Sequence, residues 1–133
     1  MQAYLSFNGN CAEAFAFYVK ALGGAVTFSL TYGESPMAGE VPKESHGRIM
    51  HMALQAGGAT LFGADLMPDT PFEGFKGFAL SVQRQDVDAG AAVFQALAEG
   101  GQVTMPFAKT FWAAGFGMLV DRFGVPWMVN CEH

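Results

Sequence analysis

Two kinds of hydrophobic periodicity alternate along the chain. Residues 11–22 and 87–98 place apolar side chains three and four positions apart, which is the spacing of an amphipathic helix. Short runs rich in β-branched and aromatic residues surround both segments and predict strands. The predicted strands cover residues 4–7, 25–30, 48–54, 59–62, 78–82, 102–105 and a hairpin between 118 and 130.

Residues that favour caps and turns mark where these elements begin and end. Asn10 and Asp86 precede the two predicted helices, and we expect each side chain to cap its helix. The glycine pairs at 23–24 and 100–101 end the helices. Residues 33–47 carry glycines, prolines and charges, and so long a loop is typical of a lid or a mobile surface segment.

The order of elements occurs twice. GGAVT at 23–27 is matched by GGQVT at 100–104, and each half reads as β-α-β-β-β. One such half cannot bury both faces of its own sheet. The pattern therefore predicts an α/β (α+β) domain over residues 1–133, with modules 1–68 and 69–133 forming a curled mixed sheet around a concave cavity.

Composition and charge exclude some classes of binding partner. The 133 residues are 51% hydrophobic with a net charge of −5, and they contain no cluster of Lys and Arg, so we expect no binding to nucleic acid or to a membrane. No apolar run approaches the roughly 20 residues of a membrane span. Met1 leads almost directly into a strand, without a secretory leader. Cys11 and Cys131 are interpreted as buried, reduced thiols, which favours a cytoplasmic location.

Three polar side chains are interpreted as structural rather than reactive. Asp121 begins the turn that ends at Gly124 and is assigned to that turn. Asp65 lies in a connector and is expected to be a solvated carboxylate. Cys11 stands near a helix N-terminus, where a thiol pKa is often lowered, but a structural thiol is favoured over a reactive one.

Several motifs resemble one known family. FYVKALG at 17–23 is similar to the first-helix signature of the vicinal-oxygen-chelate superfamily, which includes glyoxalase I, extradiol dioxygenases and bleomycin-resistance proteins. FNGNCAEA at 7–14, TFWAAGFG at 110–117 and DRFGVPWMVN at 121–130 look like its PhnB-like branch. The resemblance implies a small-molecule cavity, a homodimer, and lyase, isomerase or dioxygenase chemistry where a divalent metal is held. Members of this branch often carry a methyltransferase label, but the chain has no glycine-rich adenosylmethionine loop and we do not expect that activity.

The metal implied by the resemblance needs one ligand from each of four strands. Aligned on the strand pattern, the four positions fall near Ala3, at His51, near Gly77 and at Met128. Only His51 is a competent ligand, and a divalent ion needs about four to six converging donors. We therefore predict no metal and no other cofactor.

Six residues are the candidates for a site. His51 is the candidate catalytic base or polar anchor if its face turns away from the helix, although a structural role for a lone histidine on an apolar strand stays equally open. Trp127 is assigned to the core. The predicted ligand contacts are Phe62, Phe111, Trp112, Phe116 and Met128.

Three functions fit these observations. The first is metal-free binding of a small, partly apolar molecule, as in a resistance protein. The second is an enzyme of the superfamily with His51 as ligand or base and an atypical metal. The third is a non-catalytic domain whose loop aromatics Phe111 and Trp112 fill a dimer interface. The sequence leaves the presence of catalysis undecided.

Overall fold

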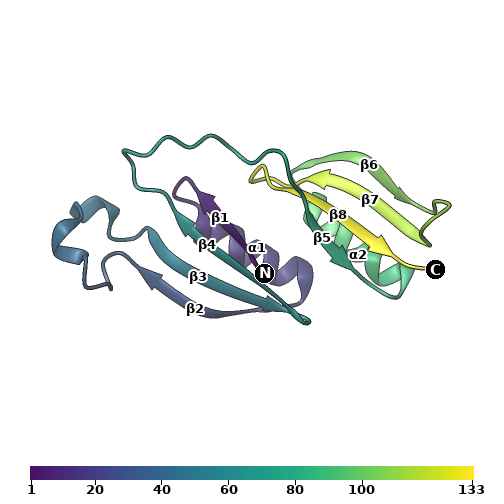
Figure 1. Ribbon diagram of the computed structural model, residues 1–133, viewed down its shortest axis with the longest axis horizontal. Coiled ribbons are helices and arrows are strands. Elements are labelled where there is room, and N and C mark those ends of the chain that lie inside the picture. Colours follow the sequence, from purple (N-terminus) through teal and green to yellow (C-terminus); the bar gives the residue numbers. More distant parts are fainter. The chain divides into compact units, whose positions relative to one another are not determined.

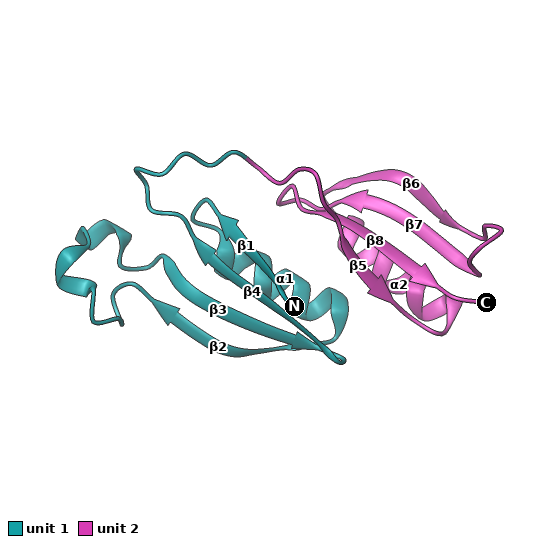
Figure 2. Ribbon diagram, in the orientation of Figure 1, with its two compact units in different colours: residues 1–73 teal, residues 74–133 magenta.

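A computed structural model describes residues 1–133, and the chain divides into two compact units. The first unit covers residues 1–73 and the second covers residues 74–133 (Figure 2). Each unit holds one α-helix and a four-stranded sheet with both parallel and antiparallel pairs. The predicted α+β class with two β-α-β-β-β modules is therefore confirmed.

The first unit has the strand order β1-β4-β3-β2, in which β1 and β4 are parallel and the other pairs are antiparallel. Two short 3₁₀ turns lie within the loop that was expected at 33–47. The elements are β1 (Ala3–Phe7), α1 (Cys11–Leu22), β2 (Ala25–Thr31), the 3₁₀ turns Ala38–Glu40 and Lys43–Ser45, β3 (Ile49–Ala56) and β4 (Ala59–Asp65).

The second unit repeats this topology with the strand order β5-β8-β7-β6. Both helices have the bounds that the periodicity predicts, whereas the edge strand β6 runs through Pro106 to Ala108, beyond its expected end. An edge strand tolerates proline because one side of its backbone needs no ladder partner. The elements are β5 (Leu80–Gln83), α2 (Val87–Ala98), β6 (Gln102–Ala108), β7 (Gly115–Val120) and β8 (Pro126–Cys131).

In each unit the helix packs against one face of its sheet and leaves the opposite face without a helix (Figure 1). Both cores combine one stripe of the helix with alternate residues of the strands. The largest buried side chains of the first core are Leu5, Phe7, Phe15, Tyr18, Ile49, Met52, Leu54 and Leu61. Those of the second are Val82, Val93, Phe94, Leu97, Leu119, Val125, Trp127 and Val129.

The turn before β8 is organised by Asp121, whose side chain is buried in the second core. Its Oδ1 accepts hydrogen bonds from the backbone N–H groups of Phe123 at 2.8 Å and Val125 at 3.0 Å. Its Oδ2 accepts a hydrogen bond from Nε1 of Trp127 at 2.8 Å. The assignment of Asp121 to the turn and of Trp127 to the core is confirmed.

Each glycine pair after a helix serves two purposes. Gly23 and Gly100 both have left-handed φ angles, of 76° and 75°. Gly23 ends α1 in this conformation, whereas Gly100 follows Glu99, the extended residue that ends α2. Gly24 and Gly101 lie against the neighbouring hairpin, where an added Cβ would stand 2.3 Å from a backbone carbonyl oxygen in both units. The repeated Gly-Gly signal in the sequence therefore reports a left-handed turn followed by a close backbone approach.

Asp65 is not the solvated carboxylate that the sequence predicts. Its side chain is only 4% exposed, and Oδ1 accepts hydrogen bonds from the backbone N–H groups of Gly9 at 3.0 Å and Cys11 at 2.9 Å. Its Oδ2 accepts one from the N–H group of Ile49 at 2.9 Å. The expected side-chain cap at Asn10 is absent, and the carboxylate of Asp65 instead binds the N–H group of Cys11, the first residue of α1.

In the second unit, the place of Asp65 is taken by Cys131. Leu5 pairs with Gly63 in the first unit, and Val82 pairs with Val129 in the second, so Gly63 and Val129 correspond. Asp65 and Cys131, each two positions further along its strand, therefore correspond as well. The Cys131 Sγ approaches the carbonyl oxygen of Asp86 at 3.6 Å. Here the helix is capped by Asp86 itself, whose Oδ2 accepts a hydrogen bond from the N–H group of Ala89 at 3.0 Å, as predicted.

Both cysteines are buried free thiols, as predicted. Burial raises the pKa of the Cys11 thiol to about 12, and the nearby Asp65 carboxylate adds to the rise. The pKa of the Cys131 thiol is also raised, chiefly by burial. The alternative of a lowered pKa at the start of α1 is therefore wrong.

The loop between β2 and β3 is held by its own side chains. The His46 Nε2 lies 2.8 Å from the carbonyl oxygen of Ala38 and 3.0 Å from that of Val41. Ser35 and Ser45 are buried at its two ends. None of the helices in the structure has the length and apolar character needed to cross a membrane.

We predict that Asp65→Ala lowers the free energy of unfolding by about 3 kcal/mol, because it leaves two buried N–H groups and one part-buried N–H group without their acceptor. Urea unfolding followed by far-ultraviolet circular dichroism measures the change. The exposed Asp69 offers a matched control, since Asp69→Ala removes the same group from a solvated position and is expected to change stability by less than about 0.5 kcal/mol. Equal losses for the two variants would contradict the role assigned to Asp65.

Candidate functional site

The face of the first sheet that lies opposite α1 carries a cluster of aromatic rings. Tyr4 on β1 pairs with Phe62 on β4, and Phe28 on β2 pairs with Ala53 on β3. Directly paired residues point to the same face of a sheet. Leu5 follows Tyr4 on β1 and Leu54 follows Ala53 on β3, and both leucines are buried in the core. Successive side chains of a strand point to opposite faces, so Tyr4, Ala53 and their paired residues project from the face opposite α1.

His51 lies at the centre of this cluster. Its ring centroid is 5.4 Å from that of Phe62 and 5.7 Å from those of both Tyr4 and Phe28. Tyr4 is 52% exposed and Phe28 is 50% exposed. We call these four residues the His51 cluster. The condition for a functional His51, a face turned away from the helix, is therefore met.

Two polar groups meet within the His51 cluster. Nδ1 of His51 lies 3.4 Å from the hydroxyl oxygen of Tyr4. Burial, the neighbouring Tyr32 and Cys11 raise the pKa of the Tyr4 phenol, so its hydroxyl keeps its proton at neutral pH. The only Asp, Glu, Lys or Arg in the four strands is Asp65, which is buried. The His51 cluster thus offers one imidazole and one hydroxyl beside the rings of Phe28 and Phe62.

Sequence reasoning missed Tyr4 and Phe28 as members of this site. Alternation along β1 separates Tyr4 from the buried Leu5 and Phe7, and that signal was available. Phe28 was harder to place, because the register of β2 shifts between Val26 and Phe28. Such a shift breaks the simple alternation that assigns a side chain to a face.

The second unit presents a different set of side chains on the corresponding face. Phe116 on β7 pairs with Asn130 on β8, and Met118 pairs with Met128. Met52 pairs with Gly63 on β4, and Gly117 pairs with Val129 on β8, so Met52 and Gly117 hold equivalent positions in the two units. The residues before them, His51 and Phe116, therefore correspond. The second unit therefore has a phenyl ring where the first has an imidazole.

A short loop before β7 presents two further rings. The N–H group of Thr110 donates to the carbonyl oxygen of Ala113 at 3.0 Å, and the N–H group of Ala113 donates to Oγ1 of Thr110 at 3.1 Å. Between them Phe111 is 92% exposed and Trp112 is 48% exposed. Trp112 packs edge-on against Phe111 at 4.8 Å and against Phe116 at 5.4 Å between ring centroids.

The predicted site residues thus fall into two groups. His51 and Phe62 come together on the first unit, and Phe111, Trp112 and Phe116 come together on the second. Met128 lies on the same face as Phe116, in the place that corresponds to Phe62. The contacts of these residues with a ligand stay predictions.

The residues at the four predicted metal positions do not fit a divalent ion. His51 is surrounded by three aromatic rings, and Met128 offers a soft thioether. Ala3 and Gly77 have no donor side chain. Neither unit gathers three or more His, Cys, Asp or Glu side chains in a group that would hold a metal ion. The side chains at these four positions therefore do not support chemistry that depends on a divalent metal.

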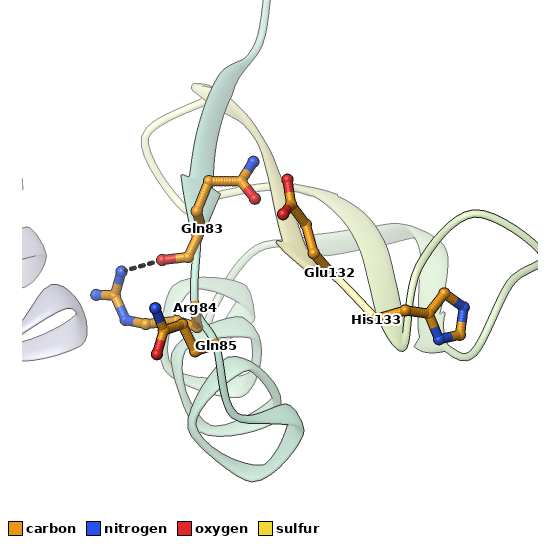
Figure 3. A pocket seen from close by; sticks show the side chains of 5 residues that line it. All are labelled: Gln83, Arg84, Gln85, Glu132 and His133. Carbon is orange, nitrogen blue, oxygen red and sulfur yellow. Dashed lines mark hydrogen bonds between the residues drawn. The ribbon is translucent and has the colours of Figure 1, made fainter.

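A hollow in the second unit lies at the end of β5 and β8 and has a volume of about 620 Å³. Arg84 and His133 point to opposite sides in Figure 3, and Nη1 of Arg84 donates to the carbonyl oxygen of Gln83 at 2.8 Å. The hollow contains none of the six predicted site residues, and its charged groups do not converge on one point. Its lining residues are Gln83, Arg84, Gln85, Glu132 and His133.

Comparison with known proteins gives both relatives and structural neighbours. Protein YjdN of Escherichia coli (strain K12) is 35% identical over 138 residues, which cover 98% of this chain and 93% of that protein. The crystal structure of protein PA1353 from Pseudomonas aeruginosa matches with a TM-score of 0.91 and 47% identity, over 99% of this chain and 96% of the other. The PhnB protein from Bacillus cereus has a TM-score of 0.82 over 99% and 98% of the two chains, but at 23% identity it supports the fold alone.

A family model also covers nearly the whole chain. The model of the Glyoxalase/Bleomycin resistance protein/Dioxygenase superfamily matches residues 2–129, which includes both β-α-β-β-β modules. The family expected from the sequence motifs is thereby confirmed. The chain belongs to the glyoxalase/bleomycin resistance protein/dioxygenase superfamily, and protein YjdN is a relative.

Proposed function

We propose that the chain binds a small, partly apolar molecule on the His51 cluster, without a divalent metal. His51 and the hydroxyl of Tyr4 anchor the polar part of the ligand. The rings of Phe28 and Phe62 contact its apolar part. Phe111, Trp112, Phe116 and Met128 supply apolar contacts to ligands of the second unit.

The observation that carries this proposal is the surroundings of His51. Three rings lie within 5.7 Å of the imidazole between centroids, on a sheet face that no helix of the first unit covers. Small-molecule sites are mostly apolar and aromatic, with a few polar groups that fix orientation. A histidine needed only for packing would not require two half-exposed aromatic neighbours, Tyr4 and Phe28, on the solvent side.

The same geometry supports a second role in which His51 acts as a general base. A ligand seated on the cluster lies within hydrogen-bond reach of the imidazole, and histidine is the side chain that most often serves as a general base. Tyr4, which stays protonated, would hold the ring orientation through Nδ1. In that case the proposed binding site is also the site of a lyase or isomerase reaction.

The test uses 2-naphthol, which has a hydroxyl group, and naphthalene, which has none. We expect the wild-type protein to bind 2-naphthol about tenfold more tightly, which corresponds to one hydrogen bond of about 1.4 kcal/mol. In His51→Phe the apolar surface is kept and the imidazole is lost, so the preference for 2-naphthol falls to the part that the Tyr4 hydroxyl supplies. In the double variant His51→Phe, Tyr4→Phe both polar groups are lost, and the two affinities become equal. Titrations followed by nuclear magnetic resonance measure the dissociation constants.

A variant in the other unit provides the control. Phe78 is 41% exposed and lies before β5, so Phe78→Ala removes an exposed ring without touching the His51 cluster. Its preference for 2-naphthol over naphthalene is expected to match that of the wild type. An undiminished preference in His51→Phe would refute the anchor role of His51.

The proposal also predicts the metal content of the protein. Protein purified without a histidine tag is expected to contain far less than one equivalent of Zn, Ni, Fe or Mn, because the residues around His51 supply too few donors. Elemental analysis by plasma mass spectrometry measures the content. One equivalent of any of these metals, retained after dialysis, would overturn the metal-free function and favour the enzyme with an atypical site.

We propose further that the chain forms a homodimer and works in the cytoplasm. Two-fold dimers are the commonest oligomers, and the half-exposed apolar residues of both units offer surface for an interface. The buried free thiols of Cys11 and Cys131 suit a reducing compartment. The third candidate, a pure interaction domain, differs from this proposal in requiring that the loop aromatics be buried between subunits.

Fluorescence quenching separates these two roles of the loop. The indole of Trp112 is half-exposed, whereas Trp127 is buried and hydrogen-bonded to Asp121. Iodide is therefore expected to quench the wild-type emission strongly and the emission of Trp112→Phe only weakly. If the assembled wild-type protein resists quenching as well as the variant does, Trp112 lies in an interface and the interaction domain is favoured.

A further inference from the structure

Three methionines form a row across the second sheet. Met105 on β6 pairs with Met118 on β7, and Met118 pairs with Met128 on β8. Met118 and Met128 are directly paired in a regular ladder and point to the face opposite α2, and Met105, which lies between two register shifts of β6, stands beside them through its pairing with Met118. We call these three residues the methionine row. Met105 is 36% exposed and the other two are half-buried, so the row can be reached from solvent.

Packing alone does not call for methionine at these positions. In the corresponding row of the first unit, Phe28 pairs with Ala53, and Ala53 pairs with Phe62. Hydrocarbon side chains therefore fill the same places in the same topology. The second unit differs in placing a sulfur atom at all three.

The spacing of the strands brings neighbouring sulfurs within reach of one ion. Adjacent strands are about 4.8 Å apart, and Cβ atoms of directly opposite residues are about 4.5–5.5 Å apart. A thioether sulfur lies two bonds beyond Cβ on a flexible side chain. An ion bound at a metal–sulfur distance of about 2.3 Å, as for zinc thiolates, fits between Met118 and a neighbour on either side.

The other side chains of this sheet determine which ion is favoured. The strands β5 to β8 contain no Asp, Glu, His, Lys or Arg, and Cys131 is fully buried on the helix side. Thioethers without carboxylate or imidazole select soft ions such as Cu(I) over Zn²⁺, Mg²⁺ or Mn²⁺. The ring of Phe116, two residues before Met118 on the same face, adds an aromatic surface beside the cation.

We propose that the methionine row is a binding site for a soft monovalent metal ion, Cu(I), with Met118 as the central ligand and Met105 and Met128 completing it. This site is independent of the His51 cluster, which lies on the other unit. It needs neither the divalent metal of the family nor a reaction at His51.

The test follows methionine methyl groups directly, because the buried thiols Cys11 and Cys131 also bind Cu(I) if they become exposed. Protein labelled with ¹³C in its methionine methyl groups is titrated with Cu(I) acetonitrile complex under anaerobic conditions. The first equivalent is expected to shift the methyl signals of Met105, Met118 and Met128 and to leave the exposed Met37 of the first unit unshifted. Competition with a coloured Cu(I) chelator then gives the affinity.

Two variants of equal chemistry separate a site from general thioether binding. Met118→Leu keeps the volume but removes the central sulfur, and we expect the affinity for Cu(I) to fall at least about tenfold. Met37→Leu removes an exposed methionine elsewhere and is expected to leave the affinity unchanged. Thermal unfolding within a few degrees of the wild type shows that each variant is folded.

The proposal fails under either of two results. In the first, the methyl signals of the row do not move at one equivalent of Cu(I). In the second, Met118→Leu binds Cu(I) as tightly as the wild type, which would make the row an apolar surface only. Zn²⁺ serves as the negative probe, and shifts of the row by Zn²⁺ equal to those by Cu(I) would also contradict a soft-metal site.

Discussion

A single helix can cover only one face of a four-stranded sheet, and both units of this protein are built on that constraint. α1 and α2 bury the alternate residues that face them, among them Leu54 and Val129. The strand residues that alternate with these buried ones lie on the face that has no helix, and there they include imidazole, aromatic and thioether side chains. The sites that we propose lie on these faces because the helices leave them available to a ligand.

The two units share a backbone plan but use corresponding positions differently. At the end of the last strand, Asp65 ties the start of α1 to β3, whereas Cys131 lies beside a helix that Asp86 caps by itself. On the open faces, His51 of the first unit corresponds to Phe116 of the second. The repeated topology thus keeps the two folds alike, while single substitutions give one face a titratable group and the other a row of thioethers.

Local signals in the sequence predicted both helices, the glycine pairs and the core position of Trp127, because each depends on residues close together in the chain. The failures involve distant partners. Nothing near Asp65 indicates that it binds N–H groups at Gly9 and Ile49, and the cap expected at Asn10 is absent. Tyr4 and Phe28 join His51 only through strand pairing, which a single sequence does not reveal.

We propose that a small, partly apolar ligand binds at the His51 cluster of the first unit. The most direct measurement is a chemical-shift map of the ¹³C-labelled aromatic and histidine side chains during titration with 2-naphthol. The largest shifts are expected on the rings of Tyr4, Phe28, His51 and Phe62. Saturable shifts confined to other residues, with these four rings unchanged, would contradict it.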